Sequence, residues 1–244
     1  MSDSLYFHRL ALLTGEQTVQ LLNSSRVFIF GLGGVGSWCA EGLVRSGVGS
    51  VVLVDFDTIC PTNVNRQLQA TSQAIGKKKA DELACRLSLI YPACHIESRS
   101  ECFSKKNAHF FDIRSDDYVI DAIDSLDNKL DLIEYAYDKG ARLFSSMGAA
   151  RKLDPTKLRT ADIWDTQGCP LARMVRQGLR RRGWNGHFTA VYSTEQALPV
   201  KTNTTEEAPI NGSAVHVTAT AGMILAGLVV QDAHSRSGAD LRLG

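Results

Sequence analysis

The sequence lacks a Cys-x-x-Cys pair, although six of its 244 residues are cysteine. Such pairs hold structural zinc, so their absence argues against a zinc site. A charged and then apolar N-terminal signal is also missing, and we therefore expect a cytoplasmic protein. An excess of one charge is missing as well: the net charge is +1. Any binding to nucleic acid must therefore come from a local patch rather than from the charge of the whole molecule.

What is present is typical of a globular enzyme, with 44% hydrophobic residues and a length that suits one large α/β domain. The stretch 213–231 is apolar and just long enough to span a membrane. His216, Thr218 and Thr220 lie within it and favour a helix buried in the protein. We therefore expect no membrane association.

A glycine-rich motif, Gly-Leu-Gly-Gly-Val-Gly, occupies residues 31–36. It lies between the apolar run 26–30, which predicts a strand, and the helix-like stretch 35–45. In such a corner one glycine allows a tight turn, another lets the backbone approach a phosphate, and a third lets the helix pack closely on the strand. The predicted phosphate-binding glycines are Gly31, Gly33, Gly34 and Gly36. The start of the helix would add unpaired N–H groups for an anion.

An acidic residue, Asp55, follows the second predicted strand, 50–54. A carboxylate at this place can accept hydrogen bonds from ribose hydroxyls. Strand, glycine turn, helix and terminal acid together predict an adenine-nucleotide site. Enzymes that use NAD share this corner, so an NAD-linked oxidoreductase remains an alternative at this point.

Three later segments favour a site that breaks a phosphoanhydride. A polar loop carries Arg66 to the carboxyl edge of the sheet, where open α/β folds bind ligands. Lys79 stands at a helix start, where a cation opposes the helix dipole unless an anion is near; Lys77 and Lys78 suit a solvated helix start. Asp124 follows the strand that begins at residue 118 and could hold Mg²⁺ against triphosphate oxygens.

These motifs resemble the adenylating enzymes that include the ubiquitin-activating E1 domains and the bacterial activators of molybdopterin and thiamin sulfur carriers. The resemblance implies a Rossmann-like, doubly wound, mainly parallel sheet with added antiparallel strands and a C-terminal helix. It also implies residue roles, with Asp55 at the ribose and Asp124 at Mg²⁺. The phosphates would be bound by Asn63, Arg66 and Lys79, within matching segments that also contain Asp57 and Gln67. Arg9 resembles an arginine that reaches the nucleotide of the other subunit, which implies a homodimer.

Within this family the chain is most similar to the branch that dehydrates threonylcarbamoyladenosine in tRNA. Four segments of the second half carry this similarity: 153–158, 169–173, 191–195 and 212–222. The branch implies that ATP adenylates the carboxylate of the modified adenosine, and that ring closure then releases AMP. Catalysis would rest on Arg66, Lys79 and Asp124, with tRNA as the substrate.

An alternative within the family is an adenylyltransferase that activates the C-terminus of a sulfur-carrier or ubiquitin-like protein. The absent cysteine pairs argue against it. A sulfur-relay partner such as a cysteine desulfurase is suggested only by resemblance to relatives.

A basic cluster follows Pro170 on a predicted helix whose apolar residues would face inward. Its members, which we consider as a tRNA-binding patch, are Arg173, Arg176, Arg180, Arg181 and Arg182. The alternative is a solvated amphipathic face. Nearby Trp184 could stack on an unpaired base or belong to the core. Cys169 is the one candidate nucleophile, whereas Cys39 and Cys85 fit buried positions in helices.

The chain reads as one domain with a nucleotide-binding half, 24–147, and a substrate and dimer half, 148–232. We expect a single N-terminal helix over residues 9–23. In the second half we expect strands near 157–163 and 188–192. The irregular stretch 193–211 is either a passive loop or a lid, and 233–244 reads as a mobile tail.

Overall fold

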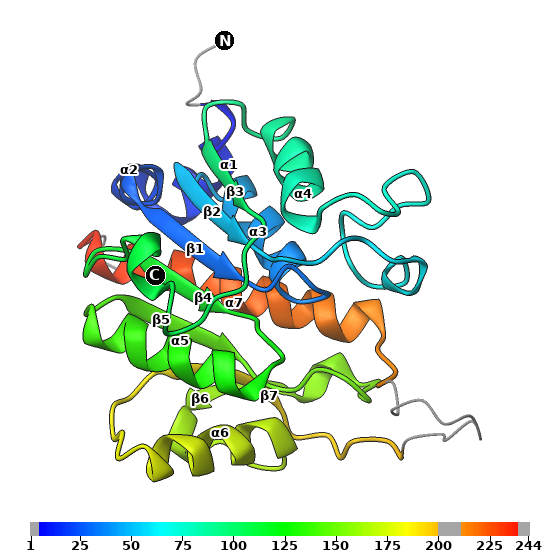
Figure 1. The fold of residues 1–244 in the computed structure, drawn as a ribbon. Coiled ribbons are helices and arrows are strands. Elements are labelled where there is room, and N and C mark those ends of the chain that lie inside the picture. The colour runs from blue at the N-terminus through cyan, green and yellow to red at the C-terminus, as the bar shows by residue number, and fades with distance from the viewer. Residues whose placement is uncertain (1–4, 200–210, 239–244) are drawn as a thin grey trace.

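A twisted seven-stranded sheet forms the centre of the molecule in the computed structural model, which describes residues 5–199 and 211–238 (Figure 1). The strand order is β3-β2-β1-β4-β5-β7-β6. All neighbouring strands pair in parallel except β6 and β7, which are antiparallel. The predicted doubly wound, mainly parallel sheet is therefore confirmed, with one antiparallel pair at its edge.

The strands are short and separated by helices through most of the chain. Their bounds are β1 (Arg26–Phe30), β2 (Ser50–Val54), β3 (His95–Arg99), β4 (Tyr118–Asp121), β5 (Arg142–Ser146), β6 (Leu158–Asp162) and β7 (Thr189–Ser193). The α-helices are α1 (His8–Thr14), α2 (Glu16–Ser24), α3 (Gly36–Arg45), α4 (Lys79–Ser88), α5 (Leu126–Asp138), α6 (Pro170–Arg181) and α7 (Val215–Arg236). Short 3₁₀ helices include η2 (Pro61–Asn63) in the loop after β2.

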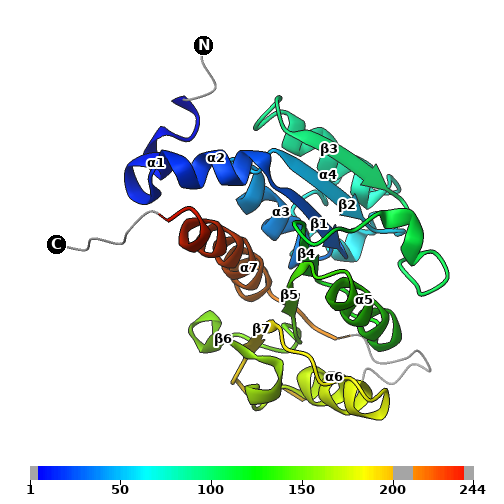
Figure 2. The same cartoon turned by 90° about the vertical axis from the view of Figure 1, so that its left-hand side faces the viewer.

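Helices cover both faces of the sheet, as Figure 2 shows. One hydrophobic cluster joins α3, α4 and α7 to one face, and a second joins α5 and α6 to the other. β1 has buried side chains on both faces, because Val27 and Ile29 belong to the first cluster and Phe28 and Phe30 to the second. Such near-continuous apolar strands are expected in a parallel sheet that is covered on both sides.

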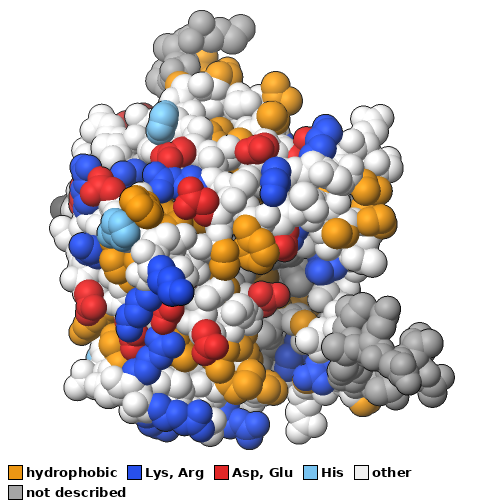
Figure 3. Space-filling model, in the orientation of Figure 1, with side chains coloured by type: hydrophobic (Ala, Val, Ile, Leu, Met, Phe, Trp, Pro, Cys, Tyr) orange, Lys and Arg blue, Asp and Glu red, His pale blue; other side chains and the backbone are white. Residues whose placement is uncertain are grey.

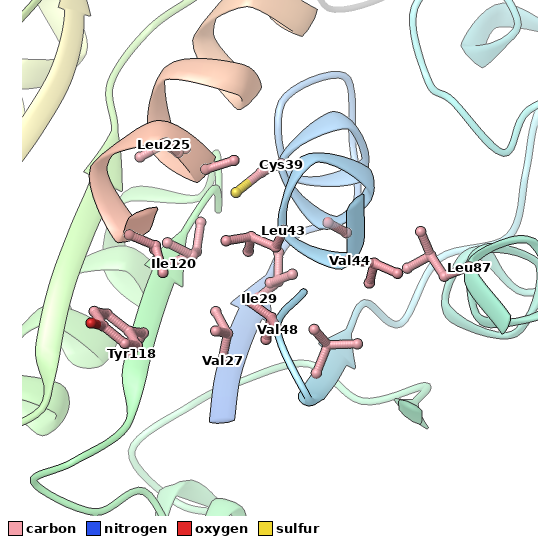
Figure 4. Packing of buried hydrophobic residues seen from close by; sticks show 14 of the residues in the cluster. Val27, Ile29, Cys39, Leu43, Val44, Val48, Leu87, Tyr118, Ile120 and Leu225 are labelled. Atoms are coloured by element: carbon pink, nitrogen blue, oxygen red, sulfur yellow. The ribbon is translucent and has the colours of Figure 1, made fainter. Parts of the chain in front are cut away.

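The apolar helix α7 packs within the protein. By length and composition it could cross a membrane, but here Leu225 and Val229 are fully buried in the cluster that covers β1 and β4. Figure 4 shows Leu225 beside Cys39 and Leu43 of α3. The preference for a buried helix agrees with this packing.

The start of the chain differs from the prediction. The expected single helix over 9–23 is broken into α1 and α2 at Gly15, whose φ is 85°. Glycine adopts such a positive φ without steric cost, so the helix can end and restart there.

The end of the chain differs too, since α7 continues past residue 231 to Arg236. Arg236 donates a hydrogen bond of 3.0 Å to the Tyr118 hydroxyl, which itself donates to Asp232 at 2.6 Å. Burial and the Asp232 carboxylate raise the pKa of Tyr118 to about 12. These contacts fix the first part of the segment that was predicted as a mobile tail; residues 239–244 and most of the irregular stretch lie outside the described residues.

Two cysteine predictions meet different outcomes. Cys39 is fully buried on α3, and burial raises the pKa of its thiol. Cys85 was expected to be buried, but it is exposed. It lies on the outer side of α4, because Leu83 and Leu87 are the residues that this helix buries.

Candidate functional site

A cavity of about 830 Å³ opens at the carboxyl ends of the parallel strands. The sheet order reverses between β1 and β4, because β2 lies on the outer side of β1 and β5 on the outer side of β4. In open α/β sheets, ligands bind outside the strand ends at such a reversal. Figure 3 shows this face hollowed to the right of its centre, and the volume suits a nucleotide together with a second ligand.

The glycine turn forms the floor of the cavity. Gly31 has a φ of 85°, and a Cβ there would lie 2.6 Å from the carbonyl oxygen of Ala122. A Cβ on Gly36 would lie 1.9 Å from the Gly31 carbonyl oxygen. The tight turn and the close packing of helix on strand are therefore as predicted. Gly33 and Gly34 line the cavity between them, so this backbone is open to a ligand.

Asp55 at the end of β2 is held by the backbone around it. Its carboxylate accepts hydrogen bonds from the N–H groups of Leu32 at 2.7 Å and Asp57 at 2.9 Å. The side chain is almost buried but lines the cavity. Its remaining lone pairs could accept ribose hydroxyls, so the ribose role stays a consistent prediction.

Lys79 lies at the first position of α4 and is 6% exposed. Its ammonium group lies 2.6 Å from the Asp57 carboxylate and 4.0 Å from that of Asp55. The cation that the sequence predicted near an anion therefore already has protein anions beside it, and it lines the same cavity. Lys77 pairs with Glu82 on the surface at 3.0 Å, as expected of a solvated helix start.

The loop that carries Arg66 is fastened to α3. Trp38 of α3 donates a hydrogen bond from its indole N–H to the Arg66 carbonyl at 2.9 Å. The Arg66 guanidinium, which lines the cavity, donates to the Thr62 carbonyl and to the Asn65 side chain. Asn63 also lines the cavity and caps η2 by accepting from the Cys60 N–H at 3.0 Å. Arg66 is thus held at the cavity wall by its own loop.

Gln67 indicates that the site is built for a polar ligand. Its side chain is 6% exposed and lines the cavity, and its amide oxygen has no hydrogen-bond partner among the described residues. Buried polar atoms are normally paired. A nucleotide that fills this end of the cavity would supply the missing partner.

Asp124 is exposed at the cavity rim, just after β4. Within residues 5–199 and 211–238, no three His, Cys, Asp or Glu side chains lie together as a metal site. Mg²⁺ commonly takes one or two carboxylates and completes its shell with phosphate oxygens and water. The single carboxylate of Asp124 beside a phosphate site therefore fits Mg²⁺ bound jointly with a nucleotide.

The sequence gave no warning of a buried charged network beneath the cavity. Lys129 and Asp121 are fully buried, and their charged groups lie 2.7 Å apart. Lys129 also donates to the Ser146 carbonyl at 3.0 Å, and Ser145 donates to Asp121 at 2.6 Å. Asp121 had been considered only as a cap. Lys129 sits one helical turn inside α5, where its burial between two strand ends could not be read from the sequence.

A second missed feature supports the other side of the cavity. Lys152 is 2% exposed and donates a short hydrogen bond to the Glu195 carbonyl. The Glu195 carboxylate accepts from the backbone N–H groups of Leu153 and Asp154. These bonds to the charged form lower the pKa of Glu195. The segment after β5 is therefore tied to the segment after β7.

Cys169 is unsuited to the role of nucleophile in this conformation. It was expected in a loop beside a substrate helix, but it precedes α6 directly and is 5% exposed. Its neighbours Pro170 and Leu171 line the cavity, whereas Cys169 does not. The thiol packs in the cluster on the α6 side of the sheet.

The five arginines of α6 divide into two groups. Arg176 bonds to Thr166, Arg180 lies over the Trp164 ring, and Arg182 bridges Asp131 and Glu134. Arg173 and Arg181 are exposed and have no such partner among the described residues. Figure 3 shows basic side chains at the bottom of the molecule, where Figure 1 draws α6.

Trp184 belongs to an aromatic cluster rather than to an open surface. Its ring contacts Tyr137, Trp164 and Phe188. The core role, one of the two open interpretations, is therefore the one that the structure favours.

Arg9 is the predicted site residue that the fold does not bring to the cavity. It is exposed on α1 and is not among the lining residues. The prediction that it contacts a nucleotide concerns a second copy of the chain and is not tested by one copy.

Comparison with known proteins agrees with this geometry. The model of the ThiF family matches residues 7–235. A Bacillus subtilis protein named tRNA threonylcarbamoyladenosine dehydratase is 37% identical over 238 residues, which are 93% of this chain and 93% of that protein.

Solved structures give the same result. Crystal structures of an Escherichia coli tRNA N6-threonylcarbamoyladenosine dehydratase in complex with AMP and with ATP are 32% identical to this chain, with TM-scores of 0.89 and 0.87. The AMP complex covers 97% of this chain and 98% of its own, and the ATP complex 100% and 99%. A Drosophila willistoni adenylyltransferase and sulfurtransferase, MOCS3, is 34% identical but covers only 46% of this chain and 24% of its own.

Proposed function

The chain belongs to the ThiF family, and from that premise we propose that it is an ATP-dependent dehydratase acting on N6-threonylcarbamoyladenosine in tRNA. The observation that carries this proposal is the cavity at the strand ends, where a glycine turn, Asp55, Arg66 and Lys79 meet. Relatives similar over nearly the full length carry the dehydratase name, and two structures hold ATP or AMP.

The reaction has two steps. A carboxylate oxygen of the threonylcarbamoyl group attacks the α-phosphorus of ATP, and the bond to the β-phosphate breaks to release pyrophosphate. A nucleophilic atom of the same substituent then attacks the activated acyl carbon, and AMP leaves. The nucleoside loses one water in sum, while ATP becomes AMP and pyrophosphate.

The side chains around the cavity suit the first step. Arg66 and Lys79 would offset the negative charge of the phosphoryl oxygens as the pyrophosphate leaves. The open backbone of the glycine turn would hold the phosphates in place. Holding both reactants in one cavity would supply much of the rate of ring closure.

We propose Mg²⁺ as the accompanying metal, with Asp124 as its protein ligand. When bound, the ion would neutralise charge on the phosphates. The exposure of Asp124 at the rim, without a protein partner among the described residues, supports this role.

The same premise supports proposals about partners. tRNA would contact α6 through Arg173 and Arg181, which have no ion pair among the described residues. Arg9 is exposed and outside its own cavity, so any contact with a nucleotide requires a second copy, and we propose a homodimer. The nature of the substrate and the packing of α7 within the fold support a cytoplasmic location.

The decisive experiment measures pyrophosphate release from ATP and Mg²⁺ with tRNA that carries threonylcarbamoyladenosine. We expect release that depends on the modification, together with loss of one water from the nucleoside by mass spectrometry. Unmodified tRNA is the control. Release that requires a small ubiquitin-like protein instead of the modified tRNA would refute the proposal and favour the sulfur-carrier alternative.

A further inference from the structure

The cavity has a side that the nucleotide does not need. Asp55, the ribose candidate, follows β2, the glycine turn follows β1 and Asp124 follows β4, so a bound ATP would extend across these strand ends. The end of β5 lies three strand spacings from that of β2, which is about 14 Å. The cavity wall after β5, residues 147–152, is therefore left for the second substrate.

Arg151 is the unusual residue of this wall. Its φ of 59° is in the left-handed region, which residues other than Gly, Asn and Asp seldom adopt. Two backbone hydrogen bonds hold it there: its N–H donates to the Gly212 carbonyl at 2.8 Å, and its carbonyl accepts from the Leu198 N–H at 2.9 Å. Strained conformations of this kind cluster at ligand sites.

The side chain of Arg151 differs from the other cations around the cavity. Lys79 is paired with Asp57, Arg66 with the oxygens of its own loop, and Lys152 with the Glu195 carbonyl. The Arg151 guanidinium is half-buried, lines the cavity and has no hydrogen bond or ion pair within residues 5–199 and 211–238. Its five N–H donors are therefore available to an anion that enters the cavity.

The surroundings of Arg151 indicate what that anion belongs to. Pro170, Leu171 and Met174 at the start of α6 give the same cavity an apolar wall, against which a purine base can pack. Gly148 and Ala149 leave space between this wall and the strand ends. An apolar surface beside one free guanidinium suits a base that carries, or is flanked by, an anionic oxygen group.

We propose that Arg151 binds an anionic oxygen group of the RNA substrate and sets its affinity. This inference rests on the proposed dehydratase function. The group is either the carboxylate on the modified adenosine or a phosphate beside that nucleotide, since a guanidinium forms paired hydrogen bonds with both. Arg151 acts on substrate binding and has no part in nucleotide binding.

The test compares Arg151→Asn with the wild-type protein. Asparagine tolerates the left-handed conformation, so the fold should remain intact. We expect the KM for modified tRNA to rise roughly tenfold, the scale of one lost charge-assisted hydrogen bond, while the KM for ATP stays the same. Arg151→Lys keeps the charge but not the paired geometry, and it should recover only part of the affinity.

A matched control is Arg114→Asn, which removes the same charge. Arg114 precedes β4, at the opposite edge of the sheet, and its exposed pair with Asp112 contributes little stability. Its KM values should equal those of the wild type. An equal KM for tRNA in Arg151→Asn and Arg114→Asn would overturn the inference, and so would a matching rise in the KM for ATP.

Two substrates distinguish the sources of the anion. With the free nucleoside threonylcarbamoyladenosine, a higher KM in Arg151→Asn identifies the carboxylate. A higher KM with tRNA alone identifies a phosphate. If the wild-type protein shows no release that depends on modified tRNA, the proposed function itself fails, which is a different outcome from a normal wild-type rate with an unaffected Arg151→Asn.

Discussion

The two halves of the cavity treat their charges differently. In residues 24–147, Lys79 is paired with Asp57 and Lys129 with Asp121, and both lysines are buried. In the second half, Arg151 and Arg181 have no ion pair among the described residues. The first half is organised in advance by its own side chains, whereas the second half keeps cations available for a ligand.

The backbone shows the same contrast. The glycine turn after β1 obtains its shape from residues that adopt it without strain. The wall after β5 includes Arg151 in a left-handed conformation, held by hydrogen bonds to segments that follow β7. A nucleotide site can thus be shared by many relatives, while the strained wall is suited to one substrate class.

The largest effect should come from Lys129→Met, which breaks the organised half. It leaves the Asp121 carboxylate buried without a cation, so the free energy of unfolding should fall by about 3–5 kcal/mol. Urea unfolding measures this loss. The double variant Lys129→Met with Asp121→Asn should recover most of it, because the uncompensated charge is gone.

A matched control is Lys105→Met, because Lys105 pairs with Glu134 at 3.3 Å and is 72% exposed. Its loss should be under about 1 kcal/mol, since an exposed pair is screened by water. Similar losses in Lys129→Met and Lys105→Met would contradict the distinction between the two kinds of charge.

The next effect concerns Arg66→Ala. Loss of this cation should reduce pyrophosphate release by about 10²–10³-fold, the usual cost of removing one group that stabilises the transition state. The fold should remain intact, because the side chain lies at the cavity wall and bonds only within its own loop. Circular dichroism and thermal unfolding check the fold, and near-normal turnover would refute the assignment of this site.

The smallest effect separates the arginines of α6. Arg181→Ala should lower the affinity for tRNA by a few-fold and reduce the slope of log affinity against log salt by about 1, because one phosphate contact is lost. Arg182→Ala removes an arginine that is held by Asp131 and Glu134, so the slope should not change. Equal changes in both slopes would show that ion pairing within the protein does not decide which arginine contacts RNA.

Local patterns were enough to predict much of the first half. The apolar runs 26–30 and 50–54 are strands with the predicted bounds, and glycine chemistry fixed the turn after the first. Helix α6 begins at Pro170 as expected. These predictions succeed because strand burial and turn geometry depend on residues close together in the chain.

The errors concern contacts between distant residues. Gly15 divides a helix that periodicity alone would continue, and Cys85 lies on the side of α4 that packing leaves exposed. The partner of Lys129 comes from another element, so no spacing along the chain reveals it. The division of the α6 arginines likewise depends on the helix and loops packed beside them.

The sequence by itself determined the nucleotide corner, since the glycines and the acid after the second strand act through local backbone geometry. It also carried the family resemblance that the comparisons confirmed. Only the tertiary structure decided which charges are compensated and which remain available, as at Lys129 and Arg151. The physical reason is that the state of a charge depends on burial and on partners in space, and the folded packing of remote segments sets both.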